Sequence, residues 1–189
     1  MSAIDKKAFI MFSSPNKNGY TKKLLDSVVC KLKNYDIDTL DVYQAQISPC
    51  TSCDYCKTYD GCIYNDDFLK VDHALKTADL LIIASPIYNM NFPSPLKAVF
   101  DRMQQYFSMR FERNIKPPIK KSKKIILLLS CGAEDDKLTK YFMSKQIEMI
   151  SSIINGKLIG TILLDSTDKT NKLKSLNDDI ISLIEKIKY

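Results

Sequence analysis

The chain has 189 residues and a formal net charge of +6, with 45% apolar and 26% charged residues. These values are typical of one soluble globular domain over residues 1–189, which can bury a core without disulfides. Nucleic acid is not expected as a partner, because the lysines are scattered instead of forming a basic stripe with aromatics. No apolar run reaches the ~18 residues that span a membrane, and the apolar run nearest the N-terminus is too short for the core of a signal peptide. We therefore expect a cytoplasmic protein without a membrane partner.

Strands and helices are expected to alternate along the chain. The strands are expected at 7–12, 37–42, 78–84, 123–129 and 158–164. Apolar residues at spacings of three and four predict helices at 21–33, 67–77, 94–107, 137–154 and 172–187. The first, third and fourth strands do not alternate polar with apolar residues, which is typical of parallel strands buried on both faces. Residues 110–122, with two adjacent prolines, are expected to form a loop.

This alternation predicts an α/β fold with a single doubly wound, five-stranded parallel sheet in the flavodoxin-like strand order 2-1-3-4-5. In such sheets, ligands bind outside the carboxyl ends of the strands, where the strand order reverses. The loops after the first and third strands, residues 13–21 and 85–93, are therefore expected to face each other and to form the site.

The first of these loops reads SSPNKNGYT and is rich in hydroxyl and amide groups. It leads into the start of a helix, where backbone N–H groups and the helix dipole favour a phosphate. The loop has neither the P-loop pattern nor the dinucleotide-binding glycine pattern. The alternative is a polar turn in which Thr21 is an ordinary N-cap.

The second loop combines apolar and amide side chains. Tyr88, Met90 and Phe92 offer flat or soft apolar surface, and Asn89 and Asn91 offer hydrogen bonds. A flavin needs an apolar slot with a few placed polar groups, which this composition supplies. The alternative is a proline-rich loop whose aromatic residues pack on the end of the sheet.

Together the two loops resemble those of the NAD(P)H-dependent FMN reductases among the flavodoxin-like proteins. The resemblance runs from residue 7 to about residue 165 and rests on Ser14-Pro15, Gly19, Thr21, Ser85-Pro86-Ile87-Tyr88, Pro95-Leu96-Lys97 and Asp101-Arg102. Two positions depart from the family pattern. Ser13 stands where the family usually has glycine, and Asn16 replaces a common arginine, which removes one charged phosphate contact.

The resemblance implies an FMN-dependent oxidoreductase in which the flavin, and no catalytic side chain, carries the chemistry. Electrons would pass from NAD(P)H or a protein donor to a small acceptor such as a quinone, nitro compound, flavin or oxygen species. It also implies a homodimer or homotetramer. The cofactor-binding residues expected on this basis are Ser14, Asn16, Asn18, Tyr20 and Thr21 near the phosphate, Ser85, Pro86, Ile87, Tyr88, Asn89 and Met90 near the isoalloxazine, and Cys131 and Gly132 at its other edge.

A cysteine-rich insert at residues 48–66 is the sharpest local signal. Cys50, Cys53, Cys56 and Cys62 follow the pattern C-x2-C-x2-C-x5-C, and three of them share the spacing that wraps a 4Fe–4S cluster. Zinc or free thiols are the alternatives. The spacing resembles that of the iron–sulfur flavoproteins within the same group, which carry a 4Fe–4S cluster beside FMN. This leaves open an electron carrier between ferredoxin-like partners, and a flavin-free binding module on the same fold.

The other two cysteines have structural interpretations. Cys30 is expected to be a small buried residue on the apolar face of the first helix. Cys131 lies near the expected site, where a packed loop cysteine is favoured over a nucleophile.

Overall fold

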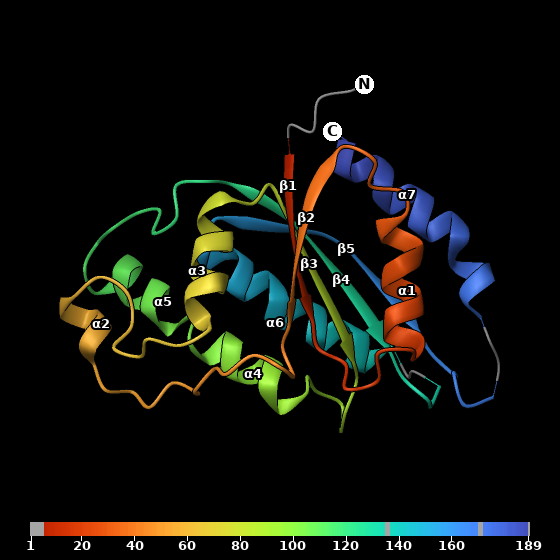
Figure 1. Cartoon of the computed structure of the whole chain (residues 1–189), viewed down its shortest axis with the longest axis horizontal. Coiled ribbons are helices and arrows are strands. Elements are labelled where there is room, and N and C mark those ends of the chain that lie inside the picture. Colours follow the sequence, from red (N-terminus) through yellow and green to blue (C-terminus); the bar gives the residue numbers. More distant parts are fainter. Residues whose placement is uncertain (1–5, 135–136, 170–171, 189) are drawn as a thin grey trace.

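The structure is a computed structural model that describes residues 6–134, 137–169 and 172–188. It contains one five-stranded parallel sheet in the order β2-β1-β3-β4-β5, so the predicted fold class and strand order are confirmed (Figure 1). The strands are β1 (Lys6–Phe12), β2 (Tyr35–Asp41), β3 (Leu80–Pro86), β4 (Lys123–Ser130) and β5 (Gly156–Leu164).

Helices connect the strands at nearly the predicted positions. They are α1 (Tyr20–Val29), α2 (Tyr55–Thr58), α3 (Phe68–Thr77), α4 (Ser94–Asp101), α5 (Gln104–Phe111), α6 (Leu138–Ile153), a 3-10 turn (Leu173–Leu176) and α7 (Asn177–Lys188). Within the described ranges, every helix is too short or too polar to cross a bilayer.

The prediction of one helix over residues 94–107 is wrong, because the segment is divided into α4 and α5 at Arg102 and Met103. There the amide of Met103 donates to the Phe100 carbonyl at 3.0 Å, an i to i−3 bond that tightens the turn. The side chain of Arg102 is buried among residues of a distant segment, which periodicity cannot reveal. Helix α5 then extends to Phe111, two residues into the region expected to be a loop.

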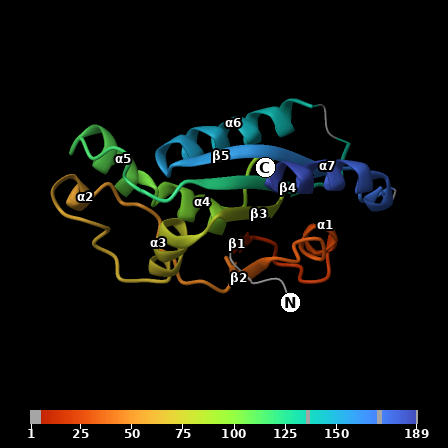
Figure 2. The same cartoon turned by 90° about the horizontal axis from the view of Figure 1, so that it is seen from above.

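Successive residues of the central strands face opposite sides of the sheet, so two cores form. Phe9 and Met11 of β1 pack in the core with α3, α4 and α6, and Ile10 and Phe12 pack in the core with α1 and α7. Figure 2 shows α6 and α1 on opposite sides of the sheet.

Cys30 is exposed, which makes the prediction that it is buried wrong. Helix α1 ends at Val29, four residues earlier than expected. The next residues form a turn in which the amide of Lys31 donates to the Val28 carbonyl at 3.1 Å.

Two lysines contact helix ends at the amino edge of the sheet. The Nζ of Lys123 donates to the carbonyls of Lys121 at 2.8 Å and Ile154, just past α6, at 2.9 Å. The Nζ of Lys124 likewise reaches two carbonyls in the last turn of α7, each at 3.0 Å. A cation is favourable there because the C-terminal end of a helix carries partial negative charge. Burial, and then the nearby charge of Lys121, lowers the pKa of Lys123 to about 8.

Candidate functional site

Three loops meet at the carboxyl edge of the sheet, the lower edge in Figure 1. After β1, the amide and the hydroxyl of Ser13 both donate to the carbonyl of Ala84 in β3, at 2.9 and 3.2 Å. After β3, the amide of Ile87 donates to the carbonyl of Ser130 at the end of β4, at 2.8 Å. The loops after the first and third strands therefore lie side by side, as predicted, at the point where the strand order reverses.

The loop after β1 is folded around Asn16. The amide of Asn16 donates to the Ser14 hydroxyl at 3.3 Å, and the side-chain oxygen of Asn16 accepts from the amide of Asn18 at 3.0 Å. A Cβ atom on Gly19 would lie 3.1 Å from the Asn16 side chain, so glycine suits this close approach. The first backbone N–H groups of α1 follow directly and have no partner within the helix. This is the geometry of an anion site at a helix N-terminus.

Lys17 supplies a cation beside this loop, which the sequence analysis did not single out. Its Nζ donates to the Ser14 carbonyl at 3.1 Å and forms an ion pair with Asp41 at the end of β2. It also lies 5.0 Å from the centre of the Phe12 ring. A positive charge is therefore present one position after Asn16, although Asp41 offsets it.

Two of the expected cofactor residues direct their hydroxyls into the protein. The Thr21 hydroxyl lies 2.7 Å from that of Ser130, and both residues are buried. The Ser85 hydroxyl is also buried and donates to the Pro86 carbonyl at 2.8 Å. Ser130 is a site residue that the sequence analysis missed, because its contact is with a residue far away in the chain.

The loop after β3 ends in a tight turn. Tyr88 and Asn91 exchange two backbone hydrogen bonds of 2.9 Å, and the residues between them, Asn89 and Met90, have φ angles of 49° and 59°. This is the pattern of a type I′ turn, which a methionine adopts at a cost. Tyr88 and Met90 are 45% and 61% exposed. The turn thus presents an aromatic ring and a thioether to solvent.

The loop after β4 is held by the residues after β5. The amide of Cys131 donates to the Leu164 carbonyl at 3.0 Å, and the Thr167 hydroxyl donates to the Cys131 carbonyl at 3.0 Å. A Cβ atom on Gly132 would lie 2.2 Å from a carboxylate oxygen of Asp168. Cys131 and Gly132 therefore lie at the same edge of the sheet as the other two loops, and Cys131 is half-buried.

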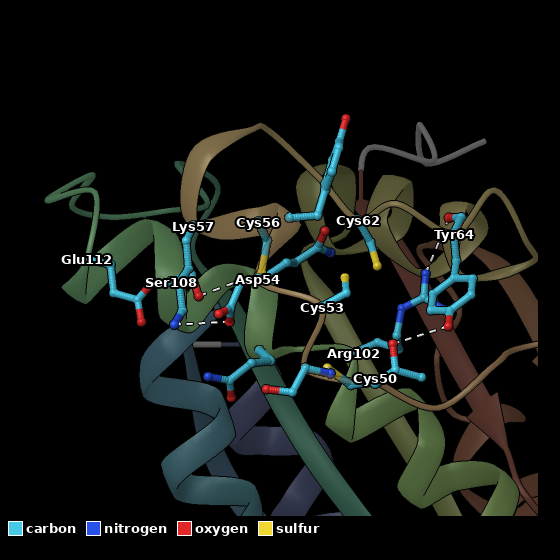
Figure 3. A pocket seen from close by; sticks show the side chains of 15 residues that line it. Cys50, Cys53, Asp54, Cys56, Lys57, Cys62, Tyr64, Arg102, Ser108 and Glu112 are labelled. Carbon is cyan, nitrogen blue, oxygen red and sulfur yellow. Dashed lines mark hydrogen bonds and ion pairs between the residues drawn. The ribbon is translucent and has the colours of Figure 1, made fainter.

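The cysteine segment, residues 48–66, lies between β2 and α3 in the chain, and its short helix α2 lies beside α5 (Figure 1). Its four cysteines line one cavity of about 160 Å³ (Figure 3). The Sγ of Cys56 is 3.6 Å from the Ser108 hydroxyl of α5. All four thiols are free, and no three His, Cys, Asp or Glu side chains of the described residues are gathered as metal ligands. The expected ligand set thus shares one cavity, and its metal stays a prediction.

Arg102 joins the two ends of the cysteine segment. Its Nη1 donates to the Ser48 carbonyl at 3.0 Å and to the Asp66 carboxylate at 2.7 Å, and its Nη2 donates to the Tyr64 carbonyl at 3.4 Å. The guanidinium carbon lies 5.1 Å from the centre of the Tyr64 ring and 4.8 Å from that of Phe68. The side chain is buried, with 2% of the residue exposed.

Asp66 is the anionic partner of this arginine. Burial by itself raises the pKa of Asp66, but hydrogen bonds from Arg102 and from the amides of Ser48 and Phe68, with the guanidinium charge, outweigh it. The pKa of Asp66 is therefore lowered. Arg102 and Gln105 both line this cavity, and a buried donor of each, Nε of Arg102 and Nε2 of Gln105, has no hydrogen-bond acceptor among the described residues.

Comparison with known proteins identifies the family. The model of the family described as "NADPH-dependent FMN reductase" matches residues 7–139. The iron–sulfur flavoprotein of Methanosarcina thermophila is 33% identical over 91 residues, which are 47% of this chain and 48% of that protein. The chain thus spans about half the length of the iron–sulfur flavoproteins it matches.

Other relatives match over more of the chain. An FMN-dependent NADH:quinone oxidoreductase of Clostridium botulinum is 28% identical over 181 residues, covering 83% of this chain and 81% of that protein. The solved NAD(P)H:quinone oxidoreductase of Methanothermobacter marburgensis superimposes with a TM-score of 0.71 at 14% identity, over 97% of this chain and 94% of that one. At this identity the likeness shows the shared flavodoxin-like fold. The family match over residues 7–139 covers most of the chain, which therefore belongs to the NADPH-dependent FMN reductase family.

Proposed function

We propose that this protein is an FMN-dependent oxidoreductase that passes electrons from NAD(P)H, or from a protein donor, to a small acceptor such as a quinone. One observation carries the proposal: hydrogen bonds link the loops after β1, β3 and β4 at the same edge of the sheet. This edge combines the N-terminus of α1, which favours an anion, with the exposed apolar side chains of Tyr88 and Met90. Family membership supports FMN as the cofactor, and the quinone reductase named above supports the class of acceptor.

The loop after β1 fits the phosphate of FMN. A phosphate monoester needs several hydrogen-bond donors and positive potential, which the first turn of α1 provides. Lys17, which is paired with Asp41, adds a cation at the same loop, and the side chain of Asn16 lies within it. Ser14 and Thr21 contribute by fixing the loop and the helix start, since their hydroxyls are engaged within the protein.

The loops after β3 and β4 fit a planar ring. Tyr88 and Met90 provide apolar surface, and Cys131 and Gly132 lie at the neighbouring strand end. Bound FMN supplies the redox chemistry, and the protein supplies binding, orientation and exclusion of water. The tight turn at Asn89 and Met90, closed by two backbone hydrogen bonds between Tyr88 and Asn91, positions the apolar side chains for that purpose.

An absorption spectrum of protein purified without oxygen, followed by FMN titration of the apoprotein, tests this proposal. We expect copurified flavin or tight binding of added FMN, and oxidation of NADH or NADPH that depends on added quinone. A protein that neither retains nor binds FMN would contradict the proposal.

A second function, one-electron transfer to a ferredoxin-like partner, is favoured by the four cysteines around one cavity. The similarity to the iron–sulfur flavoprotein of Methanosarcina thermophila also supports an iron–sulfur centre. Iron and acid-labile sulfide, assayed on the same sample, test for the cluster, and about four irons per chain are expected. Slow NAD(P)H oxidation together with fast reduction by a ferredoxin would favour the carrier over the reductase.

A homodimer or homotetramer is proposed as the working form. A groove of about 410 Å³ between α5 and α6 is lined by Phe107, Phe111 and Met149, whose side chains are exposed in the single chain. Exposed apolar surface of this kind is typical of subunit contacts. Light scattering on purified protein measures the mass. A single domain over residues 1–189 and a cytoplasmic location, where cysteines stay reduced, complete the proposal.

A further inference from the structure

The cysteine segment is fastened at both ends to one side chain. Ser48 lies two residues before Cys50, and Tyr64 lies two residues after Cys62. The carbonyls of Ser48 and Tyr64 both accept hydrogen bonds from the guanidinium of Arg102. The four cysteines are therefore carried on a loop whose two ends meet at one residue outside it.

The same guanidinium has further contacts that hold it in place. Asp66 accepts at 2.7 Å, and the rings of Tyr64 and Phe68 lie next to the guanidinium plane. Arginine suits this position, because its planar fork donates in several fixed directions and does not lose its charge. Figure 3 shows Arg102 beside Tyr64, at the cavity around which the cysteines lie.

The guanidinium of Arg102 carries five N–H groups, and the hydrogen bonds above use three of them, all on Nη1 and Nη2. The Nε–H of Arg102 is buried and lacks an acceptor among the described residues. Buried donors are nearly always satisfied, and Arg102 is one of the residues that line the cavity, so the unpartnered Nε–H points to an acceptor outside the chain. Thiolate or sulfide sulfur of a bound metal centre is an acceptor of the required negative charge.

We propose that Arg102 is the positioning residue of the metal-binding segment: it closes the loop that carries Cys50, Cys53, Cys56 and Cys62, and it donates its Nε–H to the centre they hold. The inference rests on the iron–sulfur centre proposed above. Closing the loop lowers the entropy that four ligands lose on meeting one metal centre, which strengthens metal binding. Flavin binding, at the loops after β1, β3 and β4, is expected to be independent of Arg102.

The test compares Arg102→Met with Arg113→Met. Arg113 also binds the cysteine segment, but only at its middle, through the Tyr59 carbonyl at 2.9 Å and the Asp60 carboxylate at 2.6 Å. Each protein is reconstituted anaerobically with iron and sulfide. Iron content, FMN content and the rate of iron loss to a chelator are then measured.

We expect Arg113→Met to behave as wild type, and Arg102→Met to lose iron at least tenfold faster while it retains FMN. Arg102→Lys keeps the charge but not the fork and should lie between the two. If Arg102→Met does not fold, the rate of iron loss from Arg102→Lys is the test of the proposal. Equal rates of iron loss in wild type and the Arg102 variants would overturn the proposal. Failure of wild type to take up iron would overturn it as well, and the FMN content would then show whether the flavin function stands.

Discussion

The hydroxyl of Thr21 lies 2.7 Å from the hydroxyl of Ser130, so a buried hydrogen bond ties the start of α1 to the end of β4. Thr21→Val leaves the Ser130 hydroxyl buried without this partner, which typically costs about 1–3 kcal/mol. We expect the free energy of unfolding in urea to fall by this amount, and the Kd for FMN to rise because the helix start shifts.

Thr39→Val, at an exposed threonine of β2, is the matched control and should change neither quantity. The double variant Thr21→Val/Ser130→Ala should recover most of the stability, since both polar groups are then removed. A Thr21→Val protein as stable as the Thr39→Val control would show that the hydrogen bond contributes nothing.

Gly132→Ala should weaken flavin binding with little loss of stability. The added methyl displaces the carboxylate of Asp168, which is the end of an exposed side chain and can rotate away, so we expect a loss of stability below about 1 kcal/mol. The methyl then occupies the edge proposed to face the ring, and the Kd for FMN should rise.

The comparison is Gly156→Ala, whose Cβ would lie 2.5 Å from the buried Ile125 side chain, which cannot move freely. This variant should lose about 1–3 kcal/mol of stability through overpacking, with FMN affinity retained. Unfolding in urea and FMN titration of both variants measure the two effects. Unchanged FMN affinity in Gly132→Ala would remove Gly132 from the cofactor site.

Met90→Gly should stabilise the protein and weaken flavin binding. Met90 has a φ of 59°, and relief of this left-handed conformation offsets the entropy that glycine adds to the unfolded chain, for a gain of up to about 1 kcal/mol. Loss of the thioether should raise the Kd for FMN. Asn114→Gly, at a φ of 55° outside the site, is the control for the backbone effect alone. Equal FMN affinity in both variants would argue against a contact between Met90 and the ring.

The lowered pKa of Lys123 predicts that the free energy of unfolding rises at alkaline pH. Its pKa is lowered by burial to about 8 in the folded chain, whereas an unfolded lysine titrates near ~10.4. Between these values the unfolded state binds more protons, so the free energy of unfolding increases with pH, by at most about 3 kcal/mol. Urea unfolding at several pH values between 7 and 10.5 should show this rise relative to Lys123→Met. Lys120→Met, at an exposed lysine, should show the same rise as wild type. Parallel stability curves for wild type, Lys123→Met and Lys120→Met would show that Lys123 is not the source of the rise.

The sheet and the meeting of the loops could be predicted because both depend on local signals. Runs such as Leu80–Ala84 are apolar on both faces, and a polar loop at the end of each central strand is visible in the sequence. The contacts that hold the site could not be predicted, because Thr21 and Ser130 are 109 residues apart and Arg102 and Asp66 are 36 apart. The break between α4 and α5 could not be predicted for the same reason, because it occurs at Arg102, whose partners are distant in the sequence.

The cysteine segment is attached to the fold without being part of its interior. No residue from 48 to 66, all of which the structure describes, belongs to either core, and the helices and strands that build the proposed flavin edge lie outside this segment. A shorter, cysteine-free connection between β2 and α3 would therefore keep the sheet and its cores, provided that an uncharged side chain replaces the buried Arg102, whose partners lie in this segment. This architecture allows a second redox centre to be gained or lost by exchange of one surface segment, a modular route by which members of one family can differ in the number of electrons they store.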